Sequence, residues 1–438
     1  MTIASTIYIQ RRKHLLTKMQ CGIAIIPTSP EVTRNADTHY GYRHDSNFYY
    51  LSGFTEPDAV LVLIANQNAG NASQSILFCR EKNLEREIWD GPRLGPDAAG
   101  EKLGFDAAYP INQLDEKLAE MMCSQPILFY PIGSNSAWDQ RILKLRGGIQ
   151  SNISSGVRAP DEIRNVRVLL NEMRLFKDTH ELEIMRRAAA ISTSAHKRAM
   201  KFTRPEHYEY QVEAEILHEF FSNGARYPAY TSIVAGGTNA CVLHYIENNA
   251  QLHDGDLILI DAGCELDGYA SDITRTFPIN GKFSSAQKDV YEIVLAAQAA
   301  AIAEATPNHT WDAPHCAALR VLAQGFIDLK LCQGSVDAVL ESKSYQKFYM
   351  HRTGHWLGMD VHDVGDYKVD NNWRPLKTGM VLTVEPGCYI RPADDVPANL
   401  WNIGIRIEDD VLITSDGNEV LTDAAPKTVD DIERFMQN

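Results

Sequence analysis

Two acidic residues in the C-terminal half of this 438-residue chain are placed where they could bind a metal ion. Asp261 ends an apolar run that begins at Leu257, and Asp272 opens the next apolar run after a turn at Asp267-Gly268. A hairpin of this length brings the two carboxylates together. Because carboxylates at close range on an apolar sheet repel each other, a bound cation is the simplest way to keep both ionised.

A second pair of acidic residues repeats this pattern further along the chain. Glu385 directly follows the apolar run 381–384, and Glu408 lies in the alternating segment 403–408. A histidine-rich segment, 351–362, lies between the two pairs. Four carboxylates and one imidazole form a hard, oxygen-rich donor set, which suits two divalent ions, Mn²⁺ first and Co²⁺ or Zn²⁺ as alternatives. Each acidic residue alone could be a turn residue or an arginine partner, but their conjunction favours a metal site.

The elements that must position these residues are predicted in a repeated order. We expect two helices and then strands, at 178–201, 205–223, 230–234, 257–264 and 272–279. The second set comprises helices and strands at 284–304, 312–330, 380–390 and 404–414. Capping-box patterns begin the first helix of each set. The repeated order suggests an internal duplication, although the two halves share no sequence identity.

The first part of the chain is predicted to be a separate mixed α/β unit. Strands are expected at 60–64 and 127–131, and a helix at 112–122. The fold class is therefore α/β (α+β), with an N-terminal domain over 1–175 and a catalytic domain over 176–438.

Charge and hydropathy exclude two other classes of protein. The chain has 42 Lys and Arg against 57 Asp and Glu, a formal net charge of −15, which argues against nucleic-acid binding. The longest apolar runs, 59–65 and 293–303, are shorter than the roughly 18 to 20 residues that cross a bilayer. The first basic cluster follows the N-terminal apolar stretch instead of preceding it, so a secretory signal is not expected. We expect a cytoplasmic protein without a membrane partner.

The strings around the acidic residues resemble those of the proline-specific pita-bread metallopeptidases, and most closely the aminopeptidase P (Xaa-Pro aminopeptidase) group. They lie at 261–264, 271–277, 351–362, 384–387 and 404–409, with a further typical stretch at 38–55. The resemblance covers nearly the whole chain. It implies a duplicated pita-bread catalytic domain after an aminopeptidase P/creatinase-like domain. It also implies hydrolysis of the N-terminal Xaa-Pro bond of peptides by a metal-bridging hydroxide.

The resemblance assigns roles to individual residues. It implies five metal ligands, namely Asp261, Asp272, His355, Glu385 and Glu408. Asp272 and Glu408 would be shared by both ions, and Glu385 would also carry the proton. The substrate residues would be His244 at the scissile amide, His362 at the scissile carbonyl and His351 at the proline pocket, with Arg406 and Tyr389 supporting them.

Two further positions concern assembly and access to the site. Trp89 matches a tryptophan that in this family reaches a neighbouring subunit's active site, and family members are commonly homodimers or homotetramers. A position at the edge of the N-terminal core is the alternative for Trp89. Arg352 stands where some family members have glycine, so access to the pocket could differ.

Two alternatives to the aminopeptidase function remain open from the sequence. An Xaa-Pro dipeptidase (prolidase) has the same fold and would admit only a dipeptide's free carboxylate. A metal-free binding protein could have kept the fold without the chemistry, although such a protein is expected to lack one or more ligands.

Overall fold

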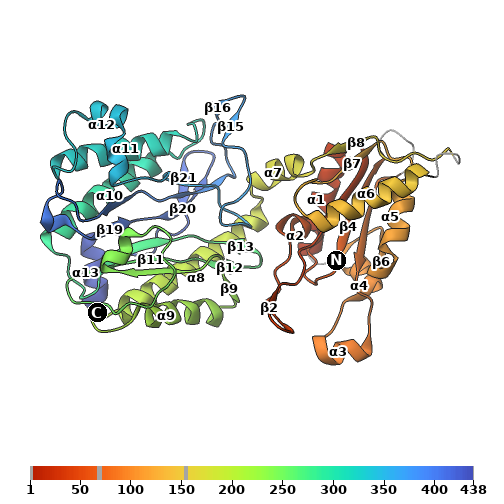
Figure 1. The fold of residues 1–438 in the computed structure, drawn as a ribbon, viewed down its shortest axis with the longest axis horizontal. Coiled ribbons are helices and arrows are strands. Elements are labelled where there is room, and N and C mark those ends of the chain that lie inside the picture. The colour runs from red at the N-terminus through yellow and green to blue at the C-terminus, as the bar shows by residue number, and fades with distance from the viewer. Residues whose placement is uncertain (1–2, 67–71, 152–155, 438) are drawn as a thin grey trace. The chain divides into compact units, whose positions relative to one another are not determined.

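The chain forms two units, Met1–Asn171 and Glu172–Asn438, and each is described by itself (Figure 1). The structure is a computed structural model that describes residues 3–66, 72–151 and 156–437. Within these ranges, no helix combines the length and the apolar character that crossing a membrane requires.

The N-terminal unit is built on a mixed six-stranded sheet in the order β6-β5-β4-β1-β7-β8. Its strands are β1 (Cys21–Pro27), β4 (Val60–Asn66), β5 (Gln74–Cys79), β6 (Ala107–Pro110), β7 (Ile127–Phe129) and β8 (Glu162–Arg164). Its helices are α1 (Ile3–Met19), α2 (Ser46–Ser52), α3 (Leu84–Asp90), α4 (Gly95–Leu103), α5 (Leu114–Met122) and α6 (Ser136–Ser151), and a hairpin comprises β2 (Thr33–Asn35) and β3 (Thr38–His39). The two strands and the helix predicted here correspond to β4, β7 and α5. Helix α7 (Arg167–Leu175) leads into the second unit.

The C-terminal unit contains two helix pairs with strands between them (Figure 1). The helices are α8 (Thr179–Phe202), α9 (Glu209–Ser222), α10 (Ser285–Glu304), α11 (Ala313–Asp328), α12 (Val336–Ser342) and α13 (Val429–Gln437). Helices α8 and α10 begin with the predicted capping boxes, in which Asp178 pairs with Glu181 and Ser284 with Gln287. The predicted start of α9 is wrong by a few residues: Tyr208 caps it through Gln211.

Strands of the C-terminal unit are shorter than predicted because they break at the acidic residues. The first half contains β9 (Tyr227–Pro228), β10 (Ile233–Gly236), β11 (Leu257–Asp261), β12 (Cys264–Leu266), β13 (Tyr269–Ala270) and β14 (Thr274–Pro278). The second half contains β15 (Lys368–Val369), β16 (Asn372–Trp373), β17 (Val381–Val384), β18 (Gly387–Ile390), β19 (Ile403–Arg406), β20 (Asp409–Ile413) and β21 (Asn418–Val420). The strands predicted at 257–264, 380–390 and 404–414 are each two strands.

The cause of one break is local. Pro386 has no N–H to donate to a neighbouring strand, and the N–H of Glu385 donates to the Thr353 carbonyl, 2.9 Å away. Strands β17 and β18 therefore join different sheets. Glu385 lies in the gap between them, as Glu408 does between β19 and β20.

Candidate metal centre

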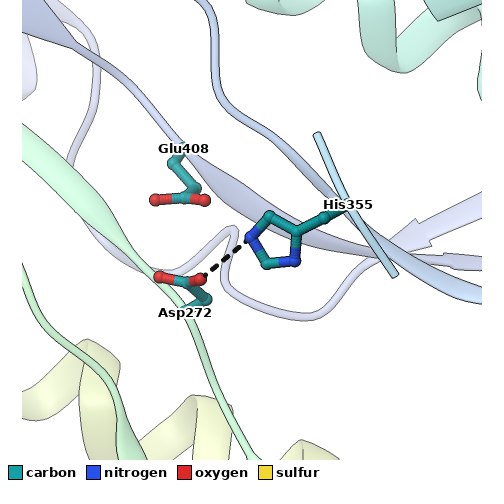
Figure 2. Close-up of side chains that lie close together, drawn as sticks. All are labelled: Asp272, His355 and Glu408. Carbon is teal, nitrogen blue, oxygen red and sulfur yellow. Dashed lines mark ion pairs between the residues drawn. The ribbon is translucent and has the colours of Figure 1, made fainter. Parts of the chain in front are cut away.

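Three side chains of the C-terminal unit converge on one point (Figure 2). Ligand atoms of Asp272, His355 and Glu408 all lie within 4.8 Å of one another. Asp272 and Glu408 are buried, and His355 is partly buried. Two carboxylates and one imidazole at this spacing can coordinate a divalent cation.

The orientation of His355 is set by its neighbours. Its ring Nδ1–H donates to the Trp356 carbonyl 3.0 Å away, and its backbone N–H donates to the Thr383 hydroxyl at 3.1 Å. Nε2 is therefore directed toward the acidic residues, 3.4 Å from Asp272 Oδ2 and 3.9 Å from Glu385 Oε1. A histidine that donates one ring N–H to a backbone carbonyl presents the other nitrogen as a metal ligand.

The hydroxyl of Tyr230 joins Asp261 to Asp272. It lies 2.6 Å from Asp261 Oδ1 and also contacts Asp272 Oδ1. One hydroxyl proton serves only one acceptor at a time, so the second carboxylate needs another partner. The expected proximity of the two aspartates, at the ends of a hairpin, is thus found in the structure.

Glu408 and Asp261 are connected through Thr274 and Arg406. The Thr274 hydroxyl donates to Glu408 Oε2 at 2.6 Å and accepts from Arg406 Nε at 3.1 Å. Arg406 also pairs with Asp261. One buried guanidinium thus offsets part of the negative charge at the centre.

Burial, more than the remaining negative charge, shifts the pKa values of the acidic residues upward. Burial raises the pKa of Glu385 to about 7, although the charges of His355 and Arg406 oppose this. Burial and then the charges of Asp272 and Glu385 hold the pKa of Glu408 well above its ordinary value. The positive charges nearby do not balance these buried carboxylates. Divalent cations would supply the missing positive charge, so the donor set fits them.

Two of the predicted substrate histidines, His351 and His362, lie beside this group. Nε2 of His351 accepts from the Tyr389 hydroxyl at 2.8 Å, and Nδ1–H donates to the Arg352 carbonyl at 2.7 Å. Burial, together with the charges of Arg406 and His244 among others, lowers the pKa of His351 to about 3, so the ring is neutral. The His362 ring lies 4.2 Å from that of His355.

Two predicted positions lie outside this group of contacts. Trp89 is on α3 of the N-terminal unit and is 83% exposed, so its alternative placement at the edge of the core is wrong. Arg352 pairs with Asp312 at 2.5 Å and lies over the ring of Trp373 at 5.0 Å. This arginine is therefore held at the surface by two partners.

Sequence reasoning missed Tyr230 and Thr274, whose hydroxyls bond to the carboxylates of predicted ligands. Tyr230 lies in a segment predicted as a strand, and no periodicity connects it to Asp261 or Asp272. Thr274 lies two positions after Asp272, so its side chain faces the same side of an extended chain, and this spacing was a usable signal.

Comparison with known proteins agrees with this geometry. Residues 183–415 match metallopeptidase family M24, and residues 8–129 match the N-terminal domain of aminopeptidase P. The Xaa-Pro aminopeptidase of Escherichia coli is 45% identical over 432 residues, covering 98% of this chain and 96% of that protein. The mitochondrial intermediate cleaving peptidase 55 of Arabidopsis thaliana is 35% identical over 433 residues, covering 98% and 83%.

Solved structures agree over nearly the full length. The aminopeptidase PepP of Pseudomonas aeruginosa superposes with a TM-score of 0.96 at 48% identity, covering 99% of this chain and 98% of that chain. A zinc-substituted E. coli aminopeptidase P in complex with product gives 0.96 at 43% identity, covering 100% and 99%. These matches confirm the mixed α/β class and the pita-bread catalytic domain, and the chain belongs to metallopeptidase family M24.

Proposed function

We propose that this chain is an Xaa-Pro aminopeptidase, which removes the N-terminal residue from peptides whose second residue is proline. The observation that carries the proposal is the convergence of Asp272, His355 and Glu408, within a chain that resembles Xaa-Pro aminopeptidases over nearly its full length. The prolidase alternative has no comparable support, since E. coli and Haemophilus influenzae relatives are both named Xaa-Pro aminopeptidases.

The proposed cofactor is a pair of divalent metal ions, Mn²⁺ in preference to Co²⁺ or Zn²⁺. Asp261, Asp272, His355, Glu385 and Glu408 would hold them, and the excess of carboxylate oxygen supports a hard cation. When bound, such ions activate water and polarise a carbonyl.

Glu385 is the proposed proton carrier. Its carboxylate lies 3.9 Å from His355 Nε2 and 3.7 Å from His351 Nδ1. Among the described contacts, no donor forms a hydrogen bond to this carboxylate. One carboxylate oxygen can therefore take the proton of the attacking water and pass it to the departing amine.

The histidines would bind the two sides of the scissile bond. His362 is exposed beside His355 and can donate to the carbonyl oxygen as negative charge develops there. The proline nitrogen carries no N–H, so His244 has no amide donor to accept from and would assist the nitrogen as it becomes an amine. Neutral His351, held by Tyr389, would form a wall of the proline pocket.

A peptide assay tests this function. We expect the metal-depleted protein, titrated with Mn²⁺, to release the first residue of an Xaa-Pro-Xaa tripeptide, and to leave the matched Xaa-Ala-Xaa tripeptide uncut. Cleavage of Xaa-Pro dipeptides alone would identify a prolidase. No cleavage of any of these peptides, with no metal bound, would favour the binding protein.

Assembly, location and domain limits are part of the same proposal. Leu84, Ile88 and Trp89 are all about 80% exposed on α3, which supports contact with another subunit in a homodimer or homotetramer. Trp89→Ala should then lower the mass measured by sedimentation, and an unchanged mass would contradict this role.

Domains over 1–175 and 176–438, and a cytoplasmic location, stay predictions.

A further inference from the structure

Glu209 is a buried carboxylate in the first turn of α9, and the proposed mechanism does not use it. Its exposed fraction is 0%. Oε1 accepts from the Gly236 N–H at 2.7 Å and from Asn239 Nδ2 at 3.0 Å, and Oε2 accepts from the Tyr245 hydroxyl and the Ala250 N–H, both at 2.8 Å. All four donors belong to one segment, 236–250.

This segment carries His244 and has little regular structure of its own. Gly236 ends β10, and beyond it the only regular element among the described residues of the segment is a single short 3₁₀ turn, Gly237–Cys241. His244 follows that turn with an exposed side chain. Without a ladder of strand hydrogen bonds, the conformation of such a segment depends on contacts with side chains. Glu209 supplies contacts near both of its ends and in its middle.

We propose that Glu209 is a positioning residue that holds the segment 236–250 in the conformation in which His244 meets the substrate. The inference rests on the proposed function for the role of His244. Hydrogen bonds to a buried carboxylate are stronger than those between neutral groups, so one side chain can fix four points of the segment. Displacing a catalytic group by about 1 Å can cost roughly 100-fold in rate.

The decisive variant is Glu209→Gln, which keeps the shape but turns an NH₂ group toward two of the donors. With Mn²⁺ bound, we expect kcat/KM for the Xaa-Pro-Xaa tripeptide to fall roughly 10- to 100-fold, with Mn²⁺ affinity unchanged. The double variant Glu209→Gln/His244→Ala should be no slower than His244→Ala alone. If the fold-losses in kcat/KM of the two single variants multiply in the double variant, the proposal is overturned, because Glu209 then does not act through His244.

A matched control lies on the same helix. Glu215 pairs with Arg198 on α8, with Oε2 and Nε 2.5 Å apart, and contacts no residue of the segment in the described bonds. Glu215→Gln makes the same chemical change and should keep kcat/KM within about two-fold. An equal loss in both variants would overturn the proposal.

Hydrogen exchange gives a readout that does not need activity. The amides of Gly236 and Ala250 should exchange faster in Glu209→Gln than in wild type or Glu215→Gln, and equal rates would contradict the anchoring. If wild type cleaves no peptide, the proposed function fails while this measurement still decides the anchoring. If Glu209→Gln does not fold, Tyr245→Phe serves instead, because it removes one hydrogen-bond donor to the Glu209 carboxylate. We expect this variant to speed the exchange of the Gly236 and Ala250 amides and to lower kcat/KM. Its loss in kcat/KM should not add to that of His244→Ala in the double variant. Wild-type behaviour of Tyr245→Phe would then overturn the proposal.

Discussion

The guanidinium of Arg406 and the carboxylate of Asp261 form an ion pair, with Nη2 2.6 Å from Oδ2. Their side chains are 5% and 13% exposed, so water screens the pair weakly. Nη1 of Arg406 also donates to the Tyr389 hydroxyl at 3.0 Å, and Tyr389 in turn donates to His351. One arginine thus orients a proposed metal ligand and a proposed wall of the proline pocket. We infer that Arg406 acts through these neighbours and not on the reacting atoms.

Arg406→Gln should weaken metal binding. Asp261 would lose its charged partner and its fixed orientation, and the loss of such a supporting contact typically costs 10- to 100-fold in metal affinity or activity. Calorimetric titration of the metal-depleted protein with Mn²⁺ measures the effect. The control is Arg186→Gln, which removes a half-exposed pair with Glu419 on the surface. Wild-type affinity in Arg406→Gln would show that the ion pair does not support the centre.

Glu385→Gln should remove most turnover and leave the fold intact. The amide cannot take a proton from water, and positioned acid–base groups contribute roughly 100- to 10,000-fold. Steady-state assays with the Xaa-Pro-Xaa tripeptide, alongside circular dichroism, test this expectation. Near-normal turnover would assign the proton transfer to another residue.

In the metal-free protein, Glu385 and His355 should contribute less to stability as the pH rises. Burial raises the pKa of Glu385 from 4.5 to about 7. Burial opposes the charged form of His355, but the hydrogen bond and charge of Asp272 raise its pKa from 6.5 to about 9. A group whose pKa is raised by folding stabilises the fold below its unfolded pKa and loses that contribution as the pH passes its folded pKa. The two windows therefore run from 4.5 to about 7 and from 6.5 to about 9.

Mn²⁺ should reverse this trend because it favours ionised carboxylates and a neutral imidazole. Thermal unfolding in chelator is expected to show a falling Tm between about pH 7 and pH 9, above the range in which His351, with its lowered pKa of about 3, opposes the trend. The rise in Tm on adding Mn²⁺ should then be larger near pH 8 than near pH 5.5. An equal rise at both pH values would mean that these groups do not hold the metal.

Asp363→Asn should destabilise the C-terminal unit strongly. Asp363 follows His362, and its buried carboxylate pairs with two buried cations, Arg174 at 2.6 Å and Lys177 at 2.9 Å. Removing one partner of a buried ion pair typically costs about 3–5 kcal/mol. Glu419→Gln, at the half-exposed pair with Arg186, should cost less than about 1 kcal/mol. Urea unfolding compares the two, and equal losses would contradict the expectation.

Much of the local structure could be predicted from the sequence, because its causes are local. The capping boxes at Asp178 and Ser284 need only residues three positions apart, and both begin helices in the structure. Apolar runs located the strands but not their breaks. Pro386 signals one break by its missing N–H. A break at Glu408 depends instead on its N–H bonding to the Thr274 carbonyl, 3.0 Å away, a distant partner that no local pattern names.

By itself, the sequence determined the kind of chemistry: acidic residues in apolar strands, a histidine between them, and the order that matches the family. Residue type sets charge, donor atoms and periodicity, and these are readable without a fold. Only the tertiary structure decided which side chains support them. The contacts of Tyr230 with the two aspartates, and of Glu209 with the His244 segment, join residues far apart along the chain. Such contacts arise from packing between elements, and no short-range spacing specifies them.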